Sequence, residues 1–223
     1  MKNLTGNLQL SVLHSDYDKL QLLYGAKELN SIYGAGCIYE PDIMFIFMNP
    51  TGRNIASSKE WKGIRAPWIG TKNIWKLLFK VGLLTEETYF HIANLKPKEW
   101  DYEFAYKLYQ KLSRKRVYIT NLGKCTQIDA KPIAAQIYRE YLPLLEKEIA
   151  MLKPKNIIAF GNQVSSILLG KSISVSRCRG RYFMKEIDEI SYPVFPVYYP
   201  VGQGMRNISI AIEDIKDIMP RVK

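Results

Sequence analysis

The stretch Phe45-Ile46-Phe47-Met48-Asn49-Pro50-Thr51-Gly52 decides the fold of this chain. It completes a continuous apolar run from Ile43 to Phe47, which is typical of a strand buried on both faces of a parallel sheet. The run stops abruptly on Asn49 and a Pro-Thr-Gly turn. Ligands of open α/β sheets bind beyond the carboxyl ends of the strands, so this stop is well placed for chemistry. An amide before proline is also a common turn residue, which leaves a purely structural role open.

Three further apolar runs predict parallel strands, and each ends on polar or turn-forming residues. The runs cover 116–120, 156–160 and 194–199, and they end at Asn121, Gly161-Asn162 and Tyr199-Pro200. Helical spacing and stop signals predict helices at about 13–33, 71–80, 102–113, 132–152, 164–169 and 208–219. This alternation predicts an α/β fold, a single three-layer α/β/α domain over 1–223 with a central, mostly parallel four-stranded sheet. The loop 50–70 is long enough to be either functional or disordered.

Charge and cysteine content restrict the function further. The chain has 223 residues with 32 Lys and Arg against 21 Asp and Glu, a formal charge of +11. This excess favours a polyanionic partner such as nucleic acid, although a generally lysine-rich composition is the alternative. Three widely spaced cysteines and two histidines support neither a disulfide framework nor a zinc site. Without a signal pattern or a membrane-spanning run, we expect a cytoplasmic monomer with no membrane partner.

Several segments, in the right order, resemble the uracil-DNA glycosylase superfamily. Met48-Asn49-Pro50-Thr51-Gly52 resembles the first motif of its mismatch-specific and single-strand-selective members. Gly63–Gly70 and Val117–Cys125 resemble segments of its family 4 branch. The resemblance runs from about Cys37 to Asn207 and also includes Lys153–Gly170, Arg179-Gly180-Arg181 and Tyr199-Pro200.

The resemblance implies an enzyme that flips uracil, or a related deaminated base, out of DNA and hydrolyses its N-glycosidic bond. Asn49 would position the attacking water, and Tyr199 would donate to the departing base where the family carries histidine. Trp68 would stack on the flipped base and Asn121 would read its polar edge. Met48 stands in the base site where family 4 has an acidic residue. The structural alternatives are that Trp68 packs in the core, that Asn121 caps a turn or helix, and that Tyr199 packs within the sheet.

The implied DNA contacts come from two regions. Gly161 and Asn162 open a helix whose amides can take a phosphate, near the basic residues Arg179 and Arg181. The loop after the last strand is suited to enter the gap left by a flipped nucleotide, and the residues concerned are Gln203, Met205 and Arg206. A solvated basic face and an ordinary mobile loop remain the alternatives.

Departures from the family decide whether we expect a cofactor and which other functions compete. Family 4 members hold an iron-sulfur cluster on four cysteines, but only Cys125 stands at a ligand-like position and Tyr138 occupies the approximate place of the ligand on the following helix. We therefore expect no cluster, and the reaction needs no metal, nucleotide or redox cofactor. A catalytically weak DNA-binding or damage-sensing protein of this fold is the alternative function. An unrelated nucleotide-binding protein is disfavoured because no glycine-rich phosphate loop follows the first strand. The sequence leaves thymine, hypoxanthine and xanthine open as target bases in addition to uracil.

Overall fold

The computed structural model describes residues 8–130 and 133–219. Within these residues, six strands form one mixed sheet in the order β1-β3-β2-β4-β6-β5. Their bounds are β1 (Ala35–Gly36), β2 (Ile43–Phe47), β3 (Val117–Asn121), β4 (Asn156–Phe160), β5 (Phe183–Ile187) and β6 (Ile190–Val197). The four inner strands run parallel, which confirms the predicted α/β class and central parallel sheet.

The two edge strands were not predicted. β1 pairs antiparallel with β3, and β5 pairs antiparallel with β6. β1 is only two residues long, and β5 alternates half-buried with exposed side chains instead of forming an apolar run. A tight turn through Asp188 and Glu189, both with positive φ, joins β5 to β6. The sheet therefore has six strands where four were expected, and the two extra strands flank the predicted core.

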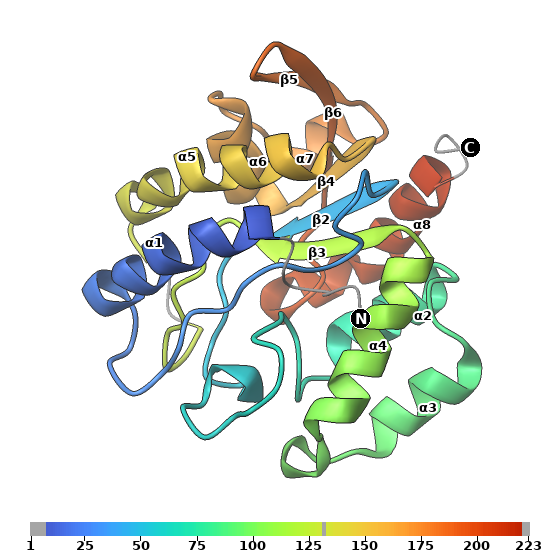
Figure 1. Cartoon of the computed structure of the whole chain (residues 1–223). Coiled ribbons are helices and arrows are strands. Elements are labelled where there is room, and N and C mark those ends of the chain that lie inside the picture. Colours follow the sequence, from blue (N-terminus) through green and yellow to red (C-terminus); the bar gives the residue numbers. More distant parts are fainter. Residues whose placement is uncertain (1–7, 131–132, 220–223) are drawn as a thin grey trace.

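Helices cover both faces of the sheet, as Figure 1 shows. The bounds are α1 (Leu8–Tyr24), α2 (Asn73–Lys80), α3 (Glu86–Asn94), α4 (Tyr102–Arg114), α5 (Ala135–Leu152), α6 (Gly161–Leu169), α7 (Val175–Cys178) and α8 (Ile208–Ile218). Side chains of β2 alternate between two cores: Phe45 and Phe47 face α2, α4 and α8, whereas Met44 and Ile46 face α1, α5 and α6. The three-layer α/β/α arrangement is confirmed.

Two predicted helix bounds were wrong, and a third falls on a residue outside the described part of the chain. The first helix ends at Tyr24 and not near residue 33, because the chain then pairs with the loop after β3 through bonds from the Ala26 and Ile32 amides. Thr71 does not cap α2; its hydroxyl donates to the Trp68 carbonyl instead, and α2 begins at Asn73. The predicted start of the long helix, residue 132, lies outside the described residues, and the described helix begins at Ala135.

The loop 50–70 is folded on itself. Its 3-10 turn Ile55–Ser57 is capped by Asn54, whose Nδ2 also donates to the Ala66 carbonyl at 2.9 Å. The Ile55 amide donates to the Ile69 carbonyl at 3.0 Å. These bonds close the loop and bring its second half back over the sheet, where it supplies Trp68 to the site.

Candidate active site

Phe47, the last residue of β2, is the point around which the predicted site residues gather. Its register partner is Asn121 at the end of β3. The fully buried Phe47 ring stacks on Phe160, the last residue of β4, at a centroid distance of 4.4 Å. Trp68 packs edge-on against the same ring at 5.0 Å, and Tyr199 does so at 6.3 Å. The carboxyl ends of three strands, the second residue after β6 and the long loop thus meet at one place.

Trp68 is held beside Phe47 by an unusual backbone conformation. Its φ is +67°, a left-handed value that costs about 1–2 kcal/mol for a residue with a Cβ. Three hydrogen bonds to the Trp68 carbonyl hold it there: the Thr71 amide at 3.1 Å, the Thr71 hydroxyl at 2.7 Å and the Trp75 indole at 3.0 Å. The Trp68 indole nitrogen is buried and has no hydrogen-bond partner among the described residues. Such local strain is characteristic of functional positions.

Asn121 presents a buried and unused donor. Its side chain is 2% exposed, and its Nδ2 finds no acceptor among the described residues. Leaving such a group unpaired costs about 1–3 kcal/mol, so native proteins rarely do so. The Asn121 carbonyl accepts a hydrogen bond of 2.6 Å from the Lys124 ammonium, which fixes the backbone beneath the side chain. The Asn121 Nδ2 is thus a buried donor without a partner among the described residues, at the carboxyl end of β3.

The Asn49 carboxamide is held by two partners. Its Nδ2 donates to the Pro50 carbonyl at 3.0 Å, and its Oδ1 accepts from the Tyr138 hydroxyl at 2.6 Å. Gly123 packs against both side chains: a Cβ there would lie 3.2 Å from the Tyr138 ring and 3.6 Å from the Asn49 Cβ. The sequence predicts for Tyr138 only that it occupies the approximate place of an iron-sulfur cluster ligand. Its contact with Asn49 joins residues 89 positions apart, and no motif signals it.

Tyr199 lies between two strand exits. The Met48 backbone hydrogen-bonds to its phenol, while burial raises the phenol pKa well above the usual 10.0, so the group stays protonated and can donate. Gly161 has a φ of +84°, and a Cβ there would lie 3.3 Å from the Tyr199 Cβ. A Cβ on Gly204 would fall 1.7 Å from the Tyr199 carbonyl oxygen. Both glycines are needed for this close approach.

Two of the residues predicted to bind DNA are exposed and also contact other parts of the protein. The Asn162 Oδ1 accepts from the Val175 amide at 2.9 Å, and Arg179 binds Asp214 through Nε at 3.2 Å and Nη2 at 2.9 Å. Both residues are exposed, and each keeps donors that its contact does not use, the Asn162 Nδ2 and the Arg179 Nη1. Arg181, Met205 and Arg206 are exposed. Gln203 belongs to the 3-10 turn Gly202–Asn207, and its side chain lies outside what the structure describes.

The cysteines do not fit an iron-sulfur cluster. Cys37 lies at the amino end of β3, with its amide bonded to Val117, and Cys178 ends α7. On the following helix, Tyr138 and Tyr141 both lie near Cys125, and the Tyr138 hydroxyl also bonds to Asn49. Over residues 8–130 and 133–219, no group of three or more His, Cys, Asp or Glu side chains is arranged to hold a metal ion. In the same ranges, no helix combines the length and apolar character needed to cross a bilayer.

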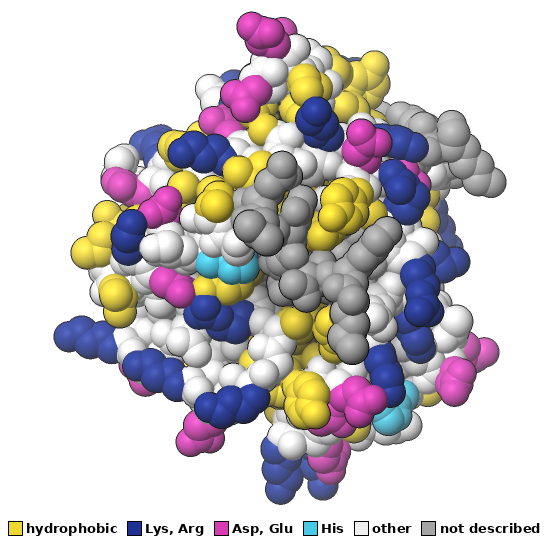
Figure 2. Space-filling model, in the orientation of Figure 1, with side chains coloured by type: hydrophobic (Ala, Val, Ile, Leu, Met, Phe, Trp, Pro, Cys, Tyr) yellow, Lys and Arg dark blue, Asp and Glu magenta, His cyan; other side chains and the backbone are white. Residues whose placement is uncertain are grey.

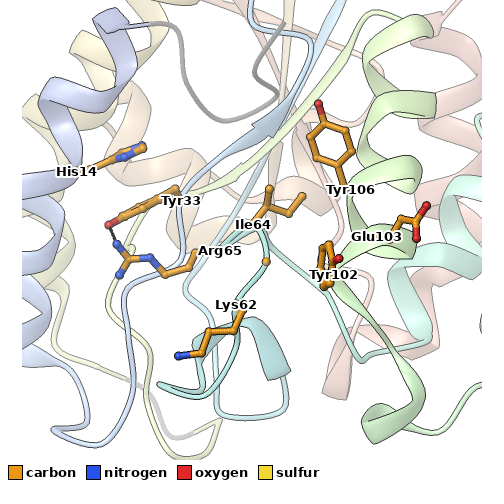
Figure 3. Close-up of a pocket in the computed structure, with 9 residues that line it drawn as sticks. His14, Tyr33, Lys62, Ile64, Arg65, Tyr102, Glu103 and Tyr106 are labelled. Atoms are coloured by element: carbon orange, nitrogen blue, oxygen red, sulfur yellow. Dashed lines mark hydrogen bonds between the residues drawn. The ribbon is translucent and has the colours of Figure 1, made fainter. Parts of the chain in front are cut away.

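A separate cavity of about 500 Å³ lies beside the amino end of α4. Figure 3 shows Tyr33 and Arg65 on one side and Tyr102 and Tyr106 on the other. Arg65 is hydrogen-bonded to Tyr33, and the ring of His14 stacks on Tyr33 at 3.8 Å. None of the predicted site residues lines this cavity, so we base the site on the strand ends and not on the cavity.

Charge is not concentrated on the face in Figure 2. Lys and Arg side chains are spread over that face, with Asp and Glu among them. The charge excess of the chain therefore does not by itself locate a binding surface on this side.

The fold is that of an α/β protein, and its candidate site lies at the carboxyl ends of parallel strands, where such folds bind ligands. The family model described as the uracil DNA glycosylase superfamily matches residues 33–216, and the chain belongs to this superfamily. The resemblance seen in the sequence is thereby confirmed.

Two curated relatives are similar over a shorter stretch. A type-4 uracil-DNA glycosylase of Saccharolobus solfataricus is 31% identical over 95 residues, which cover 41% of this chain and 44% of the relative. A type-4 uracil-DNA glycosylase of Sulfurisphaera tokodaii is 27% identical over 95 residues, which cover 41% and 43%. The matched part of this chain thus spans less than half the length of each relative.

Proposed function

We propose that this protein excises uracil, or a related deaminated base, from DNA by hydrolysing the N-glycosidic bond and leaving an abasic site. The observation that carries the proposal is the gathering of Asn121, Trp68 and Tyr199 around Phe47, with Asn49 two residues further along the chain. Membership of the uracil DNA glycosylase superfamily supports it independently.

The base-binding half of the site uses Trp68 and Asn121. An extrahelical base stacks on the indole, since an aromatic face recognises any planar ring and shields it from water. The Asn121 carboxamide offers a donor to O4 and an acceptor to N3–H of uracil, and its donor opposes the N4 amine of cytosine. The unpaired Nδ2 gains the partner it lacks in the free protein. Met48, next to Asn49, completes the site at the end of β2.

The hydrolytic half uses Asn49 and Tyr199. Bond cleavage builds positive charge on the sugar and negative charge on the departing base. The Asn49 Oδ1 has a second lone pair beyond the one bonded to Tyr138, and it orients water toward C1′. The Tyr199 phenol, kept protonated by burial, donates to the base as it leaves. Water is the co-reactant, and its oxygen ends on C1′ of the sugar.

DNA is held by charge and by the loops beside the site. The exposed guanidinium groups of Arg181 and Arg206 bind phosphates, and so do the amino-terminal amides of α6 at Gly161. Met205, 38% exposed on the turn after β6, enters the gap left by the flipped nucleotide together with Gln203.

The test uses labelled oligonucleotides that carry uracil, thymine or hypoxanthine in single and double strands, treated with alkali after incubation. We expect strand breaks at uracil, a loss of about 10²-fold or more in Asn49→Ala and an intermediate rate in Tyr199→Phe. The matched control is Asn94→Ala, an exposed asparagine at the end of α3, which should cleave as the unmodified protein does. Absence of cleavage by the unmodified protein refutes the proposal.

A second candidate is a DNA-binding or damage-sensing protein with little catalysis. It is favoured by the apolar Met48 and by Tyr199, which stand where related motifs carry an acidic residue and a histidine. The same experiment separates the two functions, because a sensor binds uracil-containing DNA and leaves it uncut.

A further inference from the structure

The contact between α5 and the first motif has no counterpart among the motifs read from the sequence. Tyr138, in the first turns of α5, is fully buried, whereas Asn49 is half-buried at the site. The phenol donates to the Asn49 Oδ1 at 2.6 Å, the short end of the usual range. A buried hydroxyl therefore reaches the one side chain that the proposed reaction needs for water.

This contact fixes which way the carboxamide faces. The Pro50 carbonyl can only accept, so the amide nitrogen must face it at 3.0 Å and the oxygen must face Tyr138. A rotated amide would place Oδ1 against the Pro50 carbonyl and turn its donors toward the site. With Tyr138 in place, one lone pair of Oδ1 is used and the other remains for a single water.

The surroundings hold the phenol in that role. A Cβ added at Gly123 would lie 3.2 Å from the Tyr138 ring, so the glycine is what lets the ring pack closely against the loop after β3. Burial raises the pKa of the Tyr138 phenol above its ordinary value, and the nearby Cys125 and Tyr199 raise it further. The hydroxyl therefore keeps its proton and remains a donor through the range in which an ordinary tyrosine would lose it.

We propose that Tyr138 is a positioning residue, which holds the Asn49 carboxamide so that its oxygen aims one water at the scissile sugar carbon. This role rests on the proposed glycosylase function and adds a second residue to its water-positioning half. A simple core tyrosine would stabilise the fold without affecting the chemical step through Asn49.

The test is single-turnover cleavage of a uracil-containing oligonucleotide by Tyr138→Phe, which removes only the hydroxyl. We expect the cleavage rate to fall about tenfold, with the dissociation constant for DNA and the melting temperature close to those of the unmodified protein. Tyr141→Phe is the matched control: it removes another buried hydroxyl from the same helix, beside Cys125 and away from Asn49, and should leave the rate unchanged.

A double variant separates positioning from a structural effect. If Tyr138 acts through Asn49, adding Tyr138→Phe to Asn49→Ala causes no further loss of rate. A rate in Tyr138→Phe equal to that of the unmodified protein, or losses that multiply in the double variant, overturns the role while leaving the glycosylase function intact. Failure of the unmodified protein to cleave uracil refutes the function itself, and the positioning role with it.

Discussion

The buried ion pair beneath Asn121 provides the most demanding test of how this site is supported. Lys124 and Glu148 are 0% and 2% exposed, and Nζ lies 2.7 Å from Oε2. At an effective dielectric constant of 20, two unit charges at this distance attract by about 6 kcal/mol. Desolvation offsets much of that attraction when the pair forms, but removing one partner leaves a buried charge with nothing to balance it.

We expect Lys124→Met to lower the free energy of unfolding by about 3 kcal/mol, the low end of the 3–5 kcal/mol typical of a broken buried pair. The low end applies because Glu148 keeps hydrogen bonds from Tyr118 at 2.7 Å, Thr120 at 3.1 Å and Tyr17 at 3.2 Å. Uracil cleavage should also fall, since the 2.6 Å bond from Lys124 to the Asn121 carbonyl is lost. Urea denaturation at 25 °C measures the first effect and single-turnover cleavage the second.

The free energy of unfolding of Glu148→Gln should rise with pH more than that of the unmodified protein. Burial lowers the pKa of Lys124 from its usual 10.5, and Glu148 opposes that shift, so removing the carboxylate lets the pKa fall further. The unfolded chain then binds the lysine proton more readily than the folded one, and stability rises with pH until the pH reaches the unfolded value. The deficit of Glu148→Gln relative to the unmodified protein should therefore shrink in alkali. A Lys124→Met variant within about 1 kcal/mol of the unmodified protein would refute this reasoning.

Two further predictions test opposite ends of the parallel strands, the amino ends at Asp42 and the carboxyl ends at the candidate site. Asp42 is partly buried, which raises its pKa, but bonds from Lys155 at 2.9 Å and Arg116 at 3.0 Å outweigh burial and the net pKa lies below the usual 3.8. Asp42→Asn should thus lower the free energy of unfolding by about 0.5–1 kcal/mol at neutral pH. The difference from the unmodified protein should disappear as the pH falls through the folded-state pKa of Asp42. Urea denaturation across the acid range measures both effects. Gly204→Ala should weaken uracil cleavage at least tenfold, because its Cβ would fall 1.7 Å from the Tyr199 carbonyl oxygen; a rate equal to that of the unmodified protein contradicts it.

The inner sheet was predictable because strands covered on both faces must be apolar throughout. Ile43–Phe47 and Asn156–Phe160 are buried at every position, and such runs are visible in a single sequence. The edge strand Phe183–Ile187 alternates half-buried with exposed side chains up to its buried last residue, so it carries no such run. Its pairing depends on the turn at Asp188 and Glu189, which the sequence analysis did not recognise.

The site residues at the strand ends could be predicted from the sequence, but the contacts that engage the other candidate side chains could not. Asn49 and Asn121 follow apolar runs, and their position beyond the strands suffices to nominate them. Whether Asn162 and Arg179 are available to DNA could not be read from the sequence, because their partners Val175 and Asp214 lie 13 and 35 residues away. Basic and amide side chains look alike in a sequence whether they face solvent or a neighbour.

The two amides of the proposed site share one support, helix α5. Tyr138 in its first turns bonds the Asn49 carboxamide, and Glu148 near its end pairs with Lys124, which in turn bonds the Asn121 carbonyl. The water-positioning half and the base-reading half are thus both tied to the layer of helices on the α1, α5 and α6 side of the sheet. Because one helix carries both contacts, a shift of α5 relative to the sheet would disturb both halves together. In the proposed reaction, cleavage therefore depends on how α5 packs as much as on the loops proposed to hold the DNA.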